Sequence, residues 1–285
     1  MSIRMSEKPD RLDLNYEAIA EIFAELAVAA GAAVMRFYKN ESHAHAKADE
    51  SPVCDADVAG EAIILDGLAA RLPDLPVISE ESADNAMAQL GEAFILVDPV
   101  DGTREFLAGK GEFTVNIGLI VRGEPKAGAV YAPALERVWM AGGAPVSFAV
   151  APGANLPPPE RRRRIHIRRP DADGLVALTS WSHTDPRTST FLAKLSVKER
   201  RMIGSSLKFC AIADGSADIY PRFGATMEWD TAAGDAVLRA AGGIVLARDG
   251  QPLRYGKASS KFMNSSFVAW GDRATVPAHL GARLA

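Results

Sequence analysis

Apolar residues recur at helical spacing in two stretches near the start of the chain. In residues 14–38 and again in residues 58–72 they return every three or four positions, which predicts two amphipathic helices. Asp57 directly precedes the second stretch and Pro73 follows it, so Asp57 is expected where that helix begins. Charged residues interrupt the longest apolar stretch, residues 19–38, and we therefore expect no membrane-spanning segment.

Short runs of apolar and β-branched residues follow the second helix. One run at residues 94–97 ends in Asp98, and an earlier run at residues 76–78 ends in Ser79 and two glutamates. Runs of this composition and length predict strands. Further strands are expected at residues 113–121, 127–131 and 138–141. The first half of the chain is therefore expected to pack helices on an antiparallel-rich sheet.

This order breaks between residues 142 and 164, where three consecutive prolines precede four consecutive arginines. Because such a composition disfavours regular structure, we expect a domain boundary there, with domains at residues 1–150 and 151–285. Beyond the boundary, strands and helices alternate as in α/β proteins. The expected strands are residues 175–180, 201–203, 217–220 and 244–247, and the expected helices are residues 188–194, 207–214 and 231–241.

Composition favours a globular protein with a small-molecule partner. The 285 residues are 48% hydrophobic, enough for one large core or two modest ones. The net charge of −4 gives no general attraction to nucleic acid or to an anionic membrane. The only cysteines, Cys54 and Cys210, are far apart in sequence, which fits a reducing compartment. The polar first 11 residues lack the pattern of a secretory signal, so a cytoplasmic location is expected.

Candidate chemistry concentrates at the end of the expected strand at residues 94–97. Asp98 and Asp101 stand three positions apart, and Pro99 and Gly102 break the regular backbone between and after them. Both carboxylates can therefore converge on one point instead of alternating across a sheet. Since two close carboxylates repel each other unless a cation lies between them, the segment indicates a divalent metal site.

Other acids lie at the ends of expected elements. They are Asp57, Glu80, Glu81 and Asp230. Hard oxygen ligands without a His or Cys cluster favour Mg²⁺ or Mn²⁺ over zinc, and such a site favours phosphoryl chemistry. Each acid also has a simpler interpretation: Asp57 and Asp230 as helix N-caps, Asp101 with Gly102 as a turn, and the two glutamates as a solvated strand end. Gly102, Thr103 and the helix start behind them offer backbone N–H groups to a phosphate.

These residues carry a resemblance to a known family. Asp98-Pro-Val-Asp-Gly-Thr103, preceded by Ser79-Glu80-Glu81 and followed by Trp229-Asp-Thr-Ala-Ala-Gly234, resembles the double motif of the inositol monophosphatase superfamily of magnesium-dependent, lithium-sensitive phosphatases. Further segments are similar to the CysQ-type 3′(2′),5′-bisphosphate nucleotidases of that superfamily: residues 47–53, 111–117, 131–133, 204–210 and 220–224. Together the resemblance covers residues 14–270.

The resemblance implies a sugar-phosphatase fold, a layered α/β/α/β/α sandwich with the metal site between two subdomains. The first half would be the metal-binding domain and the second half the substrate-binding domain. It implies two or three Mg²⁺ ions, with Mn²⁺ as a substitute and Li⁺ as an inhibitor. The first ion would take Glu80, Asp98 and the carbonyl of Val100. The second would take Asp98, Asp101 and Asp230, and a third, weaker ion would lie near Glu80.

The resemblance also implies roles in catalysis and substrate binding. Thr103 paired with Asp57 would orient and activate the attacking water, with Glu80 as a further catalytic residue and Glu81 in support. The residues implied to bind substrate are Gly102, Thr103, Ser205, Ser206, Lys208, Arg222 and Asp230. Taken alone, Lys208 is equally well interpreted as an ordinary exposed helix lysine.

Two features depart from the family pattern. Cys54 stands where the family usually has threonine, so a hydroxyl near Asp57 is absent. The four arginines at residues 161–164 are not part of the pattern. They could hold RNA or an acidic lipid surface, including the inner membrane face, but a solvated loop suits an acidic chain better.

The expected function is hydrolysis of the 3′-phosphate of adenosine 3′,5′-bisphosphate to AMP and phosphate, which clears a by-product of sulfate assimilation. The nearest alternative is an inositol or sugar monophosphate phosphatase, because the metal motifs are shared. An alternative of another class is a non-catalytic nucleotide- or RNA-binding regulator. The expected partner is a small nucleotide bisphosphate and not a nucleic acid, and the oligomeric state is left open.

Overall fold

The computed structural model describes residues 14–38, 45–46, 52–53, 55–85, 90–181 and 185–277. Cys54 and most of the segment at residues 47–53, to which part of the resemblance was assigned, lie outside these residues. Two helices, α1 (Tyr16–Met35) and α2 (Asp55–Arg71), open the described chain, with the two-residue strands β1 (His45–Ala46) and β2 (Pro52–Val53) between them.

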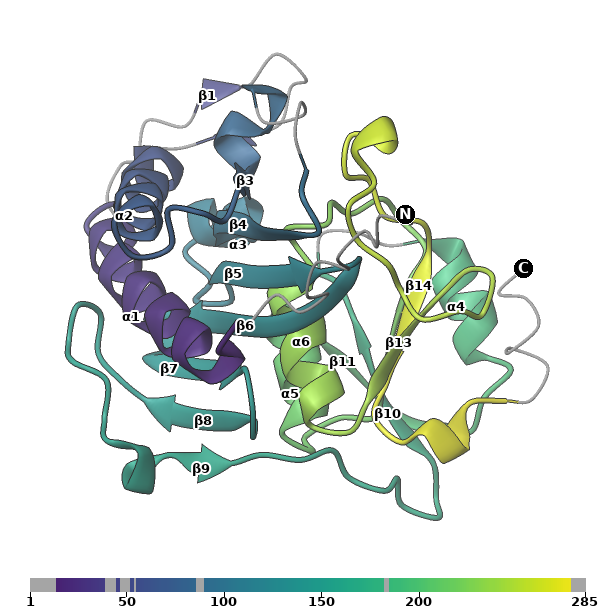
Figure 1. Cartoon of the computed structure of the whole chain (residues 1–285). Coiled ribbons are helices and arrows are strands. Elements are labelled where there is room, and N and C mark those ends of the chain that lie inside the picture. Colours follow the sequence, from purple (N-terminus) through teal and green to yellow (C-terminus); the bar gives the residue numbers. More distant parts are fainter. Residues whose placement is uncertain are drawn as a thin grey trace, which may run out of the picture.

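A seven-stranded sheet dominates the first half (Figure 1). Its order is β3 (Val77–Ser79), β4 (Ala93–Asp101), β5 (Thr114–Val121), β6 (Glu124–Ala132), β7 (Arg137–Ala141), β8 (Val146–Ala149) and β9 (Arg163–Arg164). Strands β3 and β4 are parallel, with Val77 opposite Ile95, whereas all the later neighbours are antiparallel. The predicted antiparallel-rich sheet is therefore confirmed.

A five-stranded mixed sheet forms the second half. Its order is β11 (Val197–Met202), β10 (Leu175–Thr179), β12 (Ile219–Arg222), β14 (Phe267–Trp270) and β13 (Ile244–Ala247). Strand β10 runs parallel to both β11 and β12, and β14 runs antiparallel to both of its neighbours. The helices of this half are α4 (Pro186–Leu192), α5 (Leu207–Ala213) and α6 (Ala232–Ala240).

The two sheets and the helices stack as layers (Figure 1). Helices α1 and α2 cover one face of the large sheet, where Phe23 and Ile64 share a core with Ile95 and Val97. Helices α5 and α6 lie between the two sheets, and their core includes residues of both. Leu192 of α4 packs on the outer face of the small sheet. This order confirms the predicted α/β/α/β/α sandwich.

Alternating side chains explain why β4 lies at the centre. Phe94 and Leu96 point into the core shared with α5 and α6, whereas Ile95 and Val97 point into the core under α1 and α2. Because successive side chains of a strand face opposite sides, a strand covered on both faces must be continuously apolar. The run at residues 93–97 meets that requirement, and the polar residues begin at Asp98, just after the last residue of β4 that pairs with β3.

Helix α1 is long and apolar enough to cross a membrane by length and composition alone. In the fold it is a core helix, because 61% of its apolar window is buried against the protein. Its N-cap is Asn15, whose side chain accepts from Ala18 N. This helix is therefore weak evidence for a membrane segment.

Some local predictions were wrong. Residues 146–149 and 163–164, expected to lack regular structure, form β8 and β9 at the end of the large sheet. The large sheet therefore continues past residue 150, and the division at residues 150 and 151 stays a prediction. Strand β14 was missed altogether, and β12 begins and ends two residues later than expected. Both strands are short, and their neighbours in the sheet are distant in sequence, so local pattern carries little of their signal.

Candidate metal and phosphate site

Three carboxylates gather where strands β3 and β4 of the large sheet meet the loop before α6. One oxygen each of Glu80, Asp98 and Asp230 lies within 4.8 Å of the others. Asp98 is 1% exposed, whereas Glu80 and Asp230 are half-buried. A buried cluster of like charges is unfavourable without a cation, so the geometry suits a metal ion held by oxygen ligands.

The strand geometry brings Glu80 and Asp98 together. Because β3 and β4 are parallel neighbours with Ser79 opposite Val97, the next residues, Glu80 and Asp98, lie at the same level of the sheet. A register shift between Asp98 and Asp101 bends β4 at this point. The Asp98 carboxylate is fixed by its own chain, since Val100 N donates to Asp98 Oδ1 at 3.0 Å.

Asp230 reaches the cluster from the second half of the chain. It lies two residues before α6, and Thr231, not Asp230, occupies the N-cap position of that helix. Met227 N donates to Asp230 Oδ2 at 2.8 Å, which leaves the other carboxylate oxygen for the cluster. The simpler interpretation of Asp230 as an N-cap was therefore wrong.

The electrostatics support a cation at this place. Burial raises the pKa of Asp98 well above its ordinary value, and the nearby charges of Glu80, Asp101, Asp230 and Asp57 raise it further. Burial also raises the pKa of Asp230, with Asp101 and Glu80 adding to the shift. A divalent cation would reverse this repulsion, so the donor set present fits Mg²⁺ or Mn²⁺.

Asp101 lies beside the cluster, and its carboxylate is engaged by the protein. Asp101 Oδ2 accepts from Ser206 N at 2.6 Å, and more weakly from Asn116 Nδ2 at 3.4 Å. Burial raises the pKa of Asp101, and Lys208 opposes this shift. The three-carboxylate group contains Asp98 and Asp230 but not Asp101, so the role of Asp101 as a ligand of a second ion stays a prediction.

Thr103 and Asp57 lie in the first turns of two helices near the acids, and the charge of Asp57 acts on Asp98. Thr103 opens α3 (Thr103–Leu107), and its Oγ1 donates to Val100 O at 3.2 Å. Asp57 is 2% exposed within the first turn of α2. Gly102 precedes α3 with φ of +91°, a backbone conformation that glycine adopts without strain.

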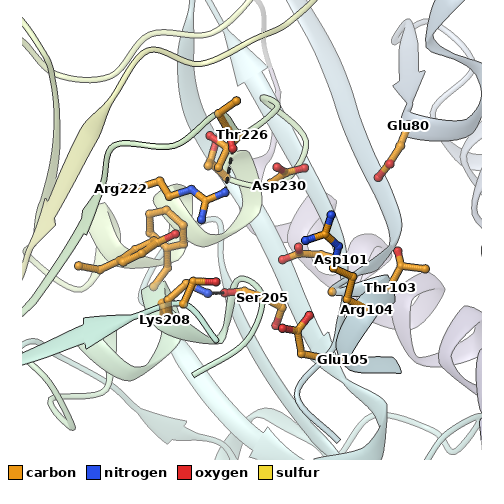
Figure 2. A pocket seen from close by; sticks show the side chains of 16 residues that line it. Glu80, Asp101, Thr103, Arg104, Glu105, Ser205, Lys208, Arg222, Thr226 and Asp230 are labelled. Carbon is orange, nitrogen blue, oxygen red and sulfur yellow. Dashed lines mark hydrogen bonds between the residues drawn. The ribbon is translucent and has the colours of Figure 1, made fainter. Parts of the chain in front are cut away.

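A cavity of about 260 Å³ opens next to the acids (Figure 2). It places Glu80, Asp101 and Asp230 along one side and Lys208 and Arg222 along the other. Arg104 lies beside Asp101, and Glu105 also lines the cavity. With a cation held by the acids, such a cavity could hold a ligand with one anionic group at each end.

Both basic side chains are buried and donate to backbone carbonyls. Lys208 is 4% exposed, and its Nζ donates to Ser205 O at 2.6 Å and to Ile203 O at 3.1 Å. Burial lowers the pKa of Lys208 to about 8. Arg222 donates from Nη2 to Ala225 O at 2.8 Å, and its buried Nε has no partner among the described residues. Lys208 is therefore no ordinary exposed lysine.

A profile of the inositol monophosphatase family matches residues 15–275. The chain belongs to this family. Members of the family are metal-dependent phosphatases. The cluster of Glu80, Asp98 and Asp230 in this protein could bind a metal ion. The family resemblance predicted from the sequence motifs is therefore confirmed.

Individual relatives and solved structures show which members of the family this chain is similar to. The chain is 42% identical to the 3′(2′),5′-bisphosphate nucleotidase CysQ of Escherichia coli K12 over 247 residues, 85% of this chain and 96% of that protein. It superposes on the crystal structure of CysQ from Bacteroides thetaiotaomicron with a TM-score of 0.75 and 33% identity, covering 92% and 100% of the two chains. An inositol monophosphatase from Anabaena shares the fold at a TM-score of 0.69 and 25% identity, covering 90% and 92%.

The structure sorts the predicted substrate-binding residues of this family member into two groups. Gly102, Thr103, Ser205, Lys208, Arg222 and Asp230 line the cavity. Ser206 is 1% exposed and lies behind it. Its Oγ donates to Asp230 O and accepts from Asn116 Nδ2, so this hydroxyl is already engaged within the protein.

Sequence reasoning missed several residues around the site. Asn116 and Thr114 of β5 both contact Asp101, and Tyr220 of β12 lies under Lys208 with its ring 5.1 Å from Nζ. One signal was available: Thr114 and Asn116 are polar positions in a fully buried strand. Buried polar side chains need partners, so such positions point toward a polar site.

Proposed function

We propose that this protein is a Mg²⁺-dependent phosphatase that removes the 3′-phosphate of adenosine 3′,5′-bisphosphate, releasing AMP and phosphate. The observation that carries the proposal is the cavity with acids at one end and Lys208 with Arg222 at the other. With Mg²⁺ held by the acids, a substrate with two phosphate groups would match both ends. The 42% identity to CysQ nucleotidases supports the same substrate class.

The acidic end of the cavity, built by both halves of the chain, would hold the phosphate that is cleaved. When bound, Mg²⁺ would supply Lewis-acid stabilisation of the charge that develops on the phosphoryl group. Glu80, Asp98 and Asp230, with the Val100 carbonyl and Asp101, are the proposed ligands of two or three ions, and Mn²⁺ would substitute while Li⁺ would inhibit. Thr103, fixed by its hydrogen bond to Val100 O, would orient the attacking water together with Asp57.

The second half would hold the phosphate that remains. Lys208 is a fixed donor, because the carbonyls of Ile203 and Ser205 hold its ammonium group. Within the described part of the chain, the buried Nε of Arg222 has no partner, and Ser205 presents its side chain to the same cavity. Charged donors of this kind bind phosphate strongly, and an uncharged inositol ring would not use them.

We further propose that the enzyme acts in the cytoplasm, where it recycles the by-product of sulfate assimilation. The reducing compartment expected from the cysteine content agrees with this location. The alternative that the arginine run contacts a membrane face gains no support from the described residues: the Arg162 side chain is turned into the protein, where it pairs with Glu21.

Comparing kcat/KM for two substrates tests the proposed function. We expect a preference of about 100-fold or more for adenosine 3′,5′-bisphosphate over inositol 1-phosphate, because one charged phosphate contact contributes a factor of ten or more. Phosphate release should require Mg²⁺, stop with EDTA and fall with Li⁺. A preference for inositol 1-phosphate would favour the alternative of an inositol phosphatase, and no release with any metal would favour a non-catalytic binding protein.

A further inference from the structure

Three polar contacts from both halves of the chain converge on Ser206. Its backbone N donates to Asp101 Oδ2 at 2.6 Å. Its Oγ donates to the backbone carbonyl of Asp230 at 2.5 Å and accepts from Asn116 Nδ2 at 3.1 Å. With 1% of its surface exposed, Ser206 is shielded from competing water.

These contacts connect four separate elements. Ser206 precedes α5, Asn116 belongs to β5, Asp101 ends β4, and Asp230 lies in the loop before α6. Asn116 also reaches Asp101 Oδ2 at 3.4 Å, which closes a small network around that carboxylate. The two acids therefore reach the site from different halves of the molecule, and one serine contacts both of their segments.

The hydroxyl of Ser206 cannot also serve the substrate as a donor. A hydroxyl has one proton to donate, and here the Asp230 carbonyl accepts it. The neighbouring Ser205 behaves differently: it lines the cavity, and it precedes Ser206 with φ of +48°, so the chain turns sharply between the two residues. Ser205 faces the cavity, whereas Ser206 faces the acid-bearing segments.

We propose that Ser206 is a positioning residue that sets the place of Asp230 relative to Asp101 and thereby the affinity of the site for its divalent cation. Met227 N already holds one oxygen of the Asp230 carboxylate, so fixing the Asp230 carbonyl leaves this residue little freedom. Residues that hold metal ligands in place typically change metal affinity by about 10- to 100-fold when they are removed. This role rests on the metal site of the proposed function but not on the identity of the substrate.

Metal titration of the full chain without nucleotide tests this role. The Kd for Mg²⁺, and for Mn²⁺ as a second probe, is measured by calorimetry for the wild type, Ser206→Ala and Ser206→Thr. We expect Ser206→Ala to weaken binding about 10-fold or more, and Ser206→Thr, which keeps the hydroxyl, to bind within about twofold of the wild type. If Ser206→Ala does not fold, as judged by melting in EDTA, Ser206→Cys replaces it, because its thiol is only a weak donor.

Ser205→Ala is the matched control. It removes the adjacent hydroxyl, which contacts neither acid, so the Kd for metal should stay unchanged while KM for the nucleotide rises. The proposal is overturned if Ser206→Ala binds metal within about twofold of the wild type, or if it only raises KM at saturating metal. If the wild type itself binds no divalent cation, the proposed function fails first, and that result is distinct from an unchanged Ser206→Ala.

Discussion

At the residue scale, Lys208 gives the clearest dependence on pH. Burial lowers the pKa of Lys208 to about 8, so its ammonium group loses its charge as the pH rises through that value. Since the neutral amine holds phosphate poorly, we expect log(kcat/KM) for the nucleotide to fall with a slope of about −1 above about pH 8. The measurement is a pH profile of kcat/KM at saturating Mg²⁺.

Lys208→Arg and Lys208→Met separate charge from shape at this position. Arginine stays protonated, so the decline near pH 8 should disappear, whereas methionine should raise KM about 10- to 100-fold at all pH values. A wild-type profile that stays flat to about pH 9.5 would contradict the role of Lys208 in binding phosphate.

A substitution of Asp98 should reveal the repulsion among the three clustered carboxylates. The pKa of Asp98 is raised in the folded protein, so its ionised form destabilises the fold at a pH above that raised pKa. This destabilisation disappears as the pH falls toward the ordinary pKa of 3.8. Asp98→Asn removes the charge and keeps the oxygen that accepts from Val100 N. We expect melting in EDTA at pH 7.5 to occur about 2–6 °C higher than in the wild type.

Magnesium should reverse this order of stability. The wild type gains stability from bound metal, whereas Asp98→Asn should show almost no shift with Mg²⁺ and almost no phosphatase activity. Thermal melts of both proteins with EDTA and with Mg²⁺ make the comparison. Equal melting temperatures in EDTA would mean that the neighbouring carboxylates do not destabilise the ionised form of Asp98.

The acids could be predicted from the sequence because their types and spacing follow from the chemistry. Asp98 and Asp101 after an apolar strand suggested a cation before any fold was known. The contacts that Ser206 and Asn116 make around these acids could not be predicted from residue type and spacing. Their contacts join residues that are distant in sequence, and only the fold brings them together.

At the element scale, close packing of α6 on the large sheet should control the position of Asp230. A Cβ added at Gly128 of β6 would lie 2.7 Å from Ala233 O, a backbone atom of α6 that cannot turn aside. We expect Gly128→Ala to lower the free energy of unfolding by about 1–3 kcal/mol and to weaken Mg²⁺ binding as α6 moves. Urea denaturation and metal titration measure the two effects.

Gly91→Ala is the control for this substitution, because the nearest atom to its Cβ would be 3.7 Å away, an ordinary contact. It should change the free energy of unfolding by less than about 0.5 kcal/mol. If Gly128→Ala is equally neutral, α6 is not in close contact with β6.

The arginine run offers a second comparison of neighbouring positions. Arg162 has 7% of its side chain exposed, pairs with Glu21 of α1, donates from Nε to Pro157 O and lies over the ring of Phe148. We expect Arg162→Ala to cost about 1–3 kcal/mol of unfolding free energy, since it leaves Glu21 and a carbonyl without their partner. Chemical denaturation provides the value.

Arg161→Ala should change the same free energy by less than about 0.5 kcal/mol, because Arg161 is exposed. Equal effects at the two positions would contradict a structural role for Arg162. The sequence predicted this run to be a solvated loop, and its charge pattern alone did not distinguish the buried arginine from its exposed neighbours.

Elements with strong periodicity were predicted well and short ones poorly. Helices α1 and α2 and strands β4 and β5 carry long apolar patterns and lie where they were predicted, although β4 continues four residues past its predicted end and α2 begins three residues early. Strand β8 has four residues and follows a glycine-rich turn, so its pattern is too short to stand out. Its strand form depends on pairing with β7, which is tertiary information.

At the scale of the whole molecule, the site depends on both halves of the chain. Glu80 and Asp98 come from the large sheet, Asp230 from the loop before α6, and Lys208 and Arg222 from α5 and β12. The layered order, with α5 and α6 between two sheets, places these segments around one cavity (Figure 1). The hydrophobic pattern predicted helices packed on sheets but not the order of the layers. That order was predicted from the family resemblance.

This arrangement separates the chemistry from the choice of substrate. The acids would act on one phosphate, and the basic side chains would hold the other. In a nucleotide with phosphates at both the 3′ and 5′ positions, the group nearer the acids should be the one removed. The identity of the remaining phosphate therefore reports directly on how the substrate lies in the cavity.

Product analysis tests this claim most directly. The full chain is incubated with adenosine 3′,5′-bisphosphate and Mg²⁺, and the nucleotides are separated by chromatography against 3′-AMP and 5′-AMP standards. We expect 5′-AMP and one equivalent of phosphate, with no product in EDTA. Release of 3′-AMP, or an unreacted substrate under the same conditions, would contradict it.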